Sequence, residues 1–549
     1  MVNNMKSRCI WATHFRSFES TYDDLHIVKV HEPDEYGNPI PKLKLIYNYE
    51  RPFWITKKDR RTNKYKRDCE YLDNLIELKS TEAALPINIF RAINGFSPTN
   101  KPRLSEVCNS NYVYGAETPS TVLIKHDYDK THELLPTQNI VASLDFETDM
   151  NHPDEMIFSG SLTIGDQTWL AVTHDYVKEI PDFENQLRKV IKRELNEYVE
   201  GRTIHIKVVK HAANVVRYLI DICHKRKPDF LSIWNMVFDV KKMIQALEAY
   251  GYNPADIFSD PSIPHEYRFF KFIEKPKTRV KADGKTLSFD SADLWHTVQT
   301  PSSFYIVDAM CFYRINRAAK GKMSVALDAV LNRHLNIGKM TISGLEGLSK
   351  AEWHRVAQKT RKLEYLAYNC FDTIGMEILD AKILDIRVTL TGYLGYRDLS
   401  KLKSNPSLLA NLCHFHLLEK RGRVLRTTGE INDDEFTAQI QDRRNWIATL
   451  PAERLLNMGR SIVAGLADNY SRVVKQGGDN DVESSYPKTG IVANISDGTT
   501  LVEVGTIEDI GYFEFRSIGI NIMSPRSNCI SLAKKLFNMP HPTDVLELI

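Results

Sequence analysis

The stretch IVASLDFET, residues 140–148, begins as an apolar run and then carries two carboxylates. Its apolar half is typical of a buried β-strand. Asp145 and Glu147 are two residues apart, so in a strand their side chains point to the same face of the sheet. Two adjacent carboxylates repel each other unless a cation lies between them. The stretch therefore predicts a divalent metal site at a strand end, although a pair of acids there can also be a solvated cap.

Two later stretches place further polar residues in comparable settings. Residues 230–239, FLSIWNMVFD, read as an apolar strand that leads to Asp239, directly before the expected start of a helix. Residues 366–372, LAYNCFD, have a helical pattern in which Tyr368 and Asp372, four residues apart, share one face. The three stretches together are far more specific than any one of them.

These elements have the forms D-x-E, N-x-x-x-D and Y-x-x-x-D. In form and order they resemble the Exo I, Exo II and Exo III motifs of the 3′→5′ proofreading exonuclease in family B DNA polymerases. The surrounding sequence is most similar to T-even-type phage polymerases, and the resemblance covers about residues 136–549. It implies an N-terminal domain in residues 1–135 and an RNase H-like exonuclease domain in residues 136–390. Asn235 and Phe238 of the second motif become candidate nucleic-acid contacts.

The chemistry implied by the resemblance is hydrolysis of a phosphodiester bond with two divalent cations. Asp145 would bridge both ions. Glu147 and Asp372 would hold the ion that carries the attacking water, and Asp239 would reach the other ion. Tyr368 would orient that water through its hydroxyl, although a half-buried helix aromatic is the other interpretation of this residue. Because all these ligands are oxygen atoms, Mg²⁺ or Mn²⁺ suits the site better than zinc.

The region around these acids is expected to form a mixed sheet flanked by helices. Three consecutive strands look antiparallel and are followed by a strand, a helix and a strand, expected at residues 139–146, 156–164, 169–173, 204–209, 211–226 and 229–234. The fold class is therefore α/β, in the form of an α+β multidomain chain. Residues 281–286 predict a hairpin, either a plain surface insertion or, by the resemblance, one that separates primer from template. Asp308 is a further strand-end acid, ranked below the motif acids.

Composition narrows the class of protein. The 549 residues suffice for about three or four domains. With 72 Lys and Arg against 70 Asp and Glu, the chain would need local basic patches to bind nucleic acid. Eight cysteines without a C-x-x-C pair favour reduced thiols in a cytoplasm, that of the host cell if the chain is phage-encoded. No apolar run reaches about 18 residues, so no membrane contact is expected.

One such patch is predicted in residues 51–68, which hold eight basic residues against two acids, interleaved with Phe53, Trp54 and Tyr65. Basic and aromatic side chains together are typical of a surface that contacts single-stranded nucleic acid. A charge run can equally be a solvated loop. The candidate contacts within it are Arg60, Arg61 and Lys64.

Residues 477–487, GGDNDVESSYP, allow two interpretations. Asp481, Ser484 and Tyr486 resemble polymerase motif A, D-x-x-S-L-Y-P-S, which implies a metal ligand at Asp481 and a floor under the incoming sugar at Tyr486. Read as G-D-N-D, the same stretch resembles motif C, but the motif B that should come first is absent. Motif A is therefore favoured, although two positions within it depart from the family pattern.

The expected function is that of an N-terminal subunit or fragment of a family B replicative DNA polymerase. Residues 391–465 would form a helical segment that returns to the N-terminal domain, and residues 466–549 a partial palm. Neither motif B nor a D-x-D pair follows Asp481, so the chain alone would be an incomplete DNA-directed DNA polymerase with 3′→5′ exonuclease activity.

Expected partners are single-stranded and primer–template DNA, dNTPs once a second chain supplies motifs B and C, and, as a further candidate, a sliding clamp. Two other interpretations stay open. One is a free-standing 3′→5′ exonuclease on single-stranded DNA with a vestigial palm. The other is a non-catalytic DNA-binding scaffold.

Overall fold

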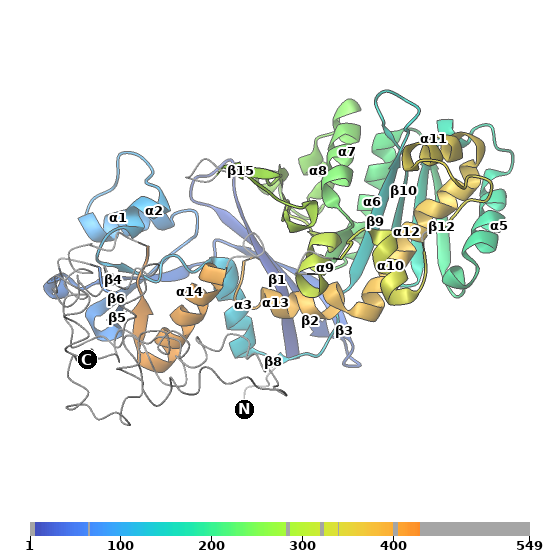
Figure 1. Cartoon of the computed structure of the whole chain (residues 1–549). Helices are drawn as coiled ribbons and strands as arrows, with labels where there is room; N and C mark the ends of the chain where they lie inside the picture. Colours follow the sequence, from blue (N-terminus) through green and yellow to red (C-terminus); the bar gives the residue numbers. More distant parts are fainter. Residues whose placement is uncertain are drawn as a thin grey trace, which may run out of the picture. The chain divides into compact units, whose positions relative to one another are not determined.

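The computed structural model describes residues 6–63, 66–280, 286–318, 323–338, 340–398 and 405–428. Met1–Thr62 and Asp68–Thr428 belong to one compact unit, which contains every helix and strand given below (Figure 1). The predicted motif A residues Asp481, Ser484 and Tyr486, the partial palm and Lys64 lie outside the described residues.

A six-stranded mixed sheet forms the centre of the region that carries the acidic motifs. Its strand order is β12-β11-β10-β9-β13-β18. β9, β10 and β11 pair antiparallel, as predicted, whereas β12, β13 and β18 join by parallel pairing. These strands are β9 (Val141–Thr148), β10 (Ile157–Ile164), β11 (Gln167–Thr173), β12 (Thr203–Val209), β13 (Phe230–Ile233) and β18 (Tyr305–Asp308). The predicted mixed α/β class is confirmed.

Helices cover both faces of this sheet (Figure 1). One apolar cluster joins the sheet to α5 (Phe183–Leu195) and α12 (Lys362–Ile383). A second cluster on the other face joins it to α6 (Ala212–Arg226) and α7 (Met236–Ala249). Side chains alternate between the two clusters along the inner strands, which is the pattern of a strand buried on both faces.

The N-terminal part is built on two smaller sheets. One has the order β3-β2-β1-β8 and the other β6-β4-β7. The strands are β1 (Lys6–Arg16), β2 (Asp24–Pro33), β3 (Pro39–Tyr47), β4 (Arg51–Thr56), β6 (Leu75–Ser80), β7 (Val113–Tyr114) and β8 (Glu133–Leu134). Lys29 of β2 is fully buried, and its ammonium donates to the backbone oxygens of Lys227, Pro228 and Ser303, between 2.6 and 3.1 Å away. It also lies 3.7 Å from Asp229, so β2 is fixed to the base of β13.

The remaining elements are short or peripheral. The helices are α1 (Leu85–Asn94), α2 (Leu104–Cys108), α3 (Ser120–Thr131), α4 (His174–Val177), α8 (Pro254–Phe258), α9 (Ala309–Arg317), α10 (Leu327–Leu335), α11 (Lys350–Thr360), α13 (Leu390–Leu394) and α14 (Asn405–His416). The strands are β5 (Cys69–Tyr71), β14 (Lys271–Ile273), β15 (Thr278–Val280), β16 (Thr286–Ser288), β17 (Thr297–Gln299) and β19 (Arg423–Leu425). β19 pairs with β5, so the chain after α14 returns to the N-terminal part. Among the described helices, none is long and apolar enough to cross a membrane.

One local expectation needs correction. α7 begins at Met236 and not near Val240, because the carboxylate of Asp308 accepts the backbone N–H groups of Asn235 and Met236 and so caps the helix earlier. Asp239 consequently lies in the first turn of α7.

The hairpin expected at residues 281–286 is flanked by the paired strands β15 and β16, and most of the stretch itself lies outside the described residues.

Candidate metal centre

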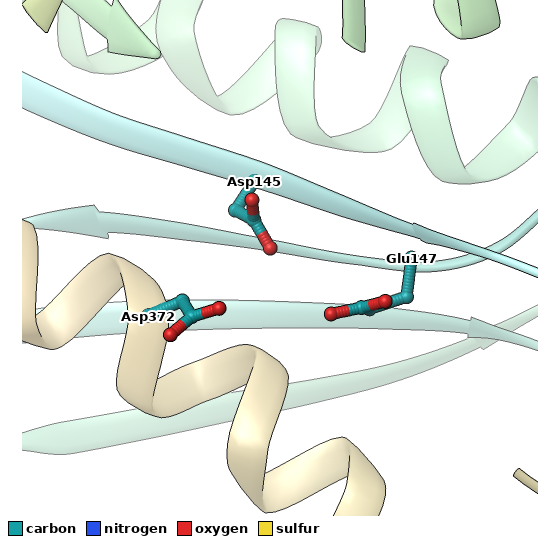
Figure 2. Close-up of side chains that lie close together, drawn as sticks. All are labelled: Asp145, Glu147 and Asp372. Carbon is teal, nitrogen blue, oxygen red and sulfur yellow. The ribbon is translucent and has the colours of Figure 1, made fainter. Parts of the chain in front are cut away.

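Three acids from two distant parts of the sequence converge on one point. Asp145 and Glu147 come from β9 and Asp372 comes from α12, and one carboxylate oxygen of each lies within 4.8 Å of the other two. Figure 2 shows the three side chains reaching toward one another from the strand and the helix. Asp372 is buried and the other two are half-buried. Such a group of oxygen atoms can hold a divalent cation, which would offset their mutual repulsion.

The alternation of β9 explains the direction of the first two acids. Leu144 and Phe146 are buried in the cluster beneath α6 and α7. Asp145 and Glu147 therefore point to the opposite face of the sheet, which α12 covers. Because Asp145 and Glu147 are two residues apart on β9, both carboxylates lie on the same face of the sheet.

α12 is fixed over the acids by polar side chains of β10. The hydroxyls of Ser161 and Thr163 lie 2.8 and 2.9 Å from the Thr373 hydroxyl. Ser159 donates to the side-chain oxygen of Asn369 at 2.9 Å. Asp372 lies between these two anchored positions of the helix, so its carboxylate is held toward β9.

Neighbouring side chains also orient the acids of β9. The Asn369 amide donates to Asp145 at 2.9 Å, and the Tyr365 hydroxyl donates to Glu147 at 2.7 Å. His354 Nδ1 lies 2.6 Å from the same hydroxyl oxygen, to which the Gln358 amide also donates at 3.2 Å. Hydrogen bonds of this kind fix the direction of metal ligands.

Sequence reasoning missed Tyr365 and Asn369 as members of the site. The signal was present, because Tyr365 and Asn369 repeat the four-residue spacing of Tyr368 and Asp372 along the same helix. His354 lies on α11, a separate helix, and no spacing in the sequence connects it to Tyr365.

Asp239 lies beside this group and is not one of its three members. Its carboxylate accepts the backbone N–H of Phe146, the residue between Asp145 and Glu147, at 3.3 Å. Burial raises the pKa of the Asp239 carboxyl well above its ordinary value, and the charges of Glu147 and Asp308 add to the rise. A cation nearby would favour the ionised form of this carboxyl.

Tyr368 is 5 % exposed and borders the acidic group. Burial raises the pKa of its hydroxyl well above the ordinary value, and the charges of Asp372, Glu147 and Asp145 raise it further. The residue is therefore neutral at physiological pH and is available as a hydrogen-bond donor. Its ring stacks on Tyr365, with 5.7 Å between the ring centroids.

Asp308 has a structural role next to the site. Its carboxylate accepts the backbone N–H groups of Met310 and Cys311 at the start of α9, in addition to those at the start of α7. Burial raises the pKa of Asp308 to about 6. The described structure thus explains this strand-end acid as a shared helix cap.

The other residues predicted to contact nucleic acid do not form one group. Asn235 is exposed and has a left-handed backbone, with φ of 65°, and Phe238 is also exposed. Arg60 is exposed and lies 3.5 Å from the carboxylate of Asp59. Arg61 is half-buried and donates to the backbone oxygens of residues 56 and 93.

Two of the three aromatic side chains expected in the basic patch do not lie on the surface, and the third, Tyr65, lies outside the described residues. Phe53 and Trp54 are buried at 1 % and 3 % exposure, in separate apolar clusters on opposite faces of β4. Apolar side chains therefore cover both faces of β4. Neither ring can stack on a base.

No family model and no curated protein matches the chain. The chemical character of the site therefore rests on its geometry. Among the described residues the group consists of carboxylates alone, and their oxygen atoms could hold a divalent cation.

Proposed function

We propose that this chain is a metal-dependent 3′→5′ exonuclease on single-stranded DNA, with an RNase H-like exonuclease domain in residues 136–390. The observation that carries the proposal is the meeting of Asp145, Glu147 and Asp372 within 4.8 Å. These acids belong to the first and third motifs, which are far apart in sequence. Asp239 of the second motif lies directly beside them.

The site residues have distinct roles in this proposal. Asp145, Glu147, Asp372 and Asp239 would bind two Mg²⁺ or Mn²⁺ ions. The ions would supply an activated water and neutralise charge on the phosphate. Tyr368 would direct its hydroxyl at the attacking water, while Tyr365 and Asn369 would hold Glu147 and Asp145 in position.

The test is degradation of a 5′-labelled oligonucleotide by the purified chain with Mg²⁺ or Mn²⁺. Asp145→Ala combined with Glu147→Ala should reduce cleavage by several orders of magnitude, about 10³-fold or more, because two ligands are lost. Asp175→Ala with Glu179→Ala is a matched control, since it removes two exposed acids of the same types. If the acidic double variant keeps the activity of the parent, the proposal fails.

We also propose that this exonuclease belongs to the N-terminal part of a family B DNA polymerase. The support is the resemblance of Asp481, Ser484 and Tyr486 to motif A, at residues outside the described structure. In the test, the chain is co-expressed with a polypeptide that carries motifs B and C, and nucleotide addition is measured. Asp481→Ala should abolish that addition and leave exonuclease activity unchanged.

A further inference from the structure

The outer edge of β12 is unpaired among the described residues. In the part of the chain that the structure describes, β12 is the last strand of the six-stranded sheet and pairs with β11 alone (Figure 1). None of the seven residues of β12 is buried, whereas six of the seven in β11 are. An open sheet edge is a template for another extended chain.

The direction of the backbone groups on this edge follows from two hydrogen bonds. The N–H of Thr203 donates to the backbone oxygen of Asp166, the residue directly before β11, so it points inward. The carbonyl of Ile204 accepts from Arg188 of α5 at 2.9 Å, so it points outward. Because N–H and C=O groups alternate between the two sides of a strand, Ile206 and Val208 present theirs outward. Val208 is also 39 % exposed.

A basic groove of about 600 Å³ adjoins this edge on the α6 side. Lys207, Lys210 and Arg217 supply its positive charges. The Arg217 guanidinium lies 4.3 Å from the centre of the Tyr252 ring and donates to its hydroxyl at 2.8 Å, which fixes its position. No ion pair is formed by these three cations among the described residues.

The acids of the groove already have partners. Asp221 lies 2.6 Å from Lys225, and Asp256 lies 3.3 Å from Arg268. The groove therefore has excess positive charge. The pKa of His211, beside it, is lowered first by burial and then by the charges of Lys210 and Arg217.

We propose that the β12 edge and this groove together bind an extended acidic segment of a partner protein. The segment would pair with the outward N–H and C=O groups of Ile206 and Val208. Its carboxylates would lie against Lys207, Lys210 and Arg217. The proposal concerns another face of the protein than the metal centre and does not depend on the exonuclease proposal.

Other occupants fit these observations less well. A nucleic acid could meet the cations, but its phosphates have no N–H groups to satisfy the carbonyls of the strand. A second copy of β12 would bring its own Lys207 toward the first, and like charges across a strand pair are unfavourable. An acidic strand would pair with the outward backbone groups of β12 and would also offset the positive charge of the groove.

The probe is a fluorescein-labelled peptide in which Asp or Glu alternates with Val or Ile. Fluorescence anisotropy with the full chain should show saturable binding. Lys207→Glu with Lys210→Glu should weaken that binding by about tenfold or more, as expected when two charge pairs become repulsive. Lys189→Glu with Lys192→Glu is the matched control, because these exposed lysines lie on α5, across the sheet from α6.

A second variant separates strand pairing from charge. Val208→Pro removes one outward N–H, and proline is tolerated on an edge strand at such a position. It should also weaken binding about tenfold while the midpoint of thermal unfolding stays near that of the parent. Equal peptide affinity for the parent and the lysine variant would overturn the proposal. The proposal would also be overturned if oligodeoxythymidylate displaced the peptide and formed a nucleic-acid complex. Self-association of the chain through the same edge would overturn it as well.

Discussion

At the scale of single residues, the two tyrosines of α12 have different environments. Tyr365 donates to the proposed metal ligand Glu147, whereas Tyr368 is surrounded by the charges of three acids. Tyr368 is therefore the better placed of the two to act on water, and Tyr365 is a positioning residue. The two can be separated by experiment.

Tyr368→Phe removes only the hydroxyl that would orient water. We expect unchanged Mn²⁺ affinity and single-turnover cleavage that is slower by about 10²-fold or more. Metal titration beside rapid-quench kinetics measures both quantities. Equal cleavage rates for variant and parent would mean that Tyr368 is a packing residue.

Tyr365→Phe removes the hydrogen bond to Glu147 and leaves the ring packing intact. We expect Mn²⁺ affinity to fall by about tenfold. This is the lower end of the range expected when a hydrogen bond that orients a metal ligand is lost. Cleavage should recover at high Mn²⁺ concentration. Tyr250→Phe, at a tyrosine that is 47 % exposed, is the control. A loss of activity that excess metal does not restore would contradict the positioning role.

The raised pKa of Asp239 gives a prediction about pH. The Asp239 carboxyl binds a proton more tightly in the folded protein than in the unfolded chain. Its contribution to the stability of the fold is therefore present below about pH 4 and is lost as the pH rises. Asp239→Asn keeps an acceptor for Phe146 and removes the buried charge. In the presence of a chelator, the variant should melt at least about 2 °C above the parent at pH 8.

The same comparison at pH 4 should show a smaller difference, because the parent carboxyl is then protonated. Asp175→Asn, at an exposed acid, should show no gain at either pH. A variant that is less stable than the parent at pH 8 would show that the ionised carboxylate is stabilising without metal.

At the scale of elements, the position of α12 depends on a row of hydroxyls. Thr373 contacts both Ser161 and Thr163, and all three side chains are buried. Thr373→Val keeps the shape of the side chain and leaves hydroxyls of β10 with fewer partners. We expect a loss of about 1–3 kcal/mol in the free energy of unfolding, measured by urea denaturation.

Exonuclease activity should fall together with this stability, because Asp372 precedes Thr373 on the helix. Thr360→Val, at an exposed threonine of α11, is the control and should change the unfolding free energy little. An unchanged unfolding midpoint for Thr373→Val would show that the row of hydroxyls does not position α12.

The elements also show what the sequence could and could not predict. The alternation of IVASLDFET was enough to place Asp145 and Glu147 together on one face. The start of α7 was missed because its cap, Asp308, comes from a strand much later in the chain. The burial of Phe53 and Trp54 was missed because a strand covered on both faces has no alternation to reveal it.

At the scale of the whole molecule, a buried charge joins the N-terminal part to the central sheet. Lys29→Met removes the donor for three backbone oxygens and one of the partners of Asp229. We expect the free energy of unfolding to fall by about 3 kcal/mol. Lys42→Met, at an exposed lysine on β3, is the control. Equal stability of the two variants would contradict a joining role for Lys29.

The contacts of Lys29 also bear on how this protein can evolve. Its ammonium recognises main-chain oxygens, which every residue type provides. The side chains at positions 227, 228 and 303 can therefore drift without loss of these hydrogen bonds, provided that the backbone keeps its course. Selection for this junction is expected to fall on a single lysine, while the segments that it joins are free to diverge.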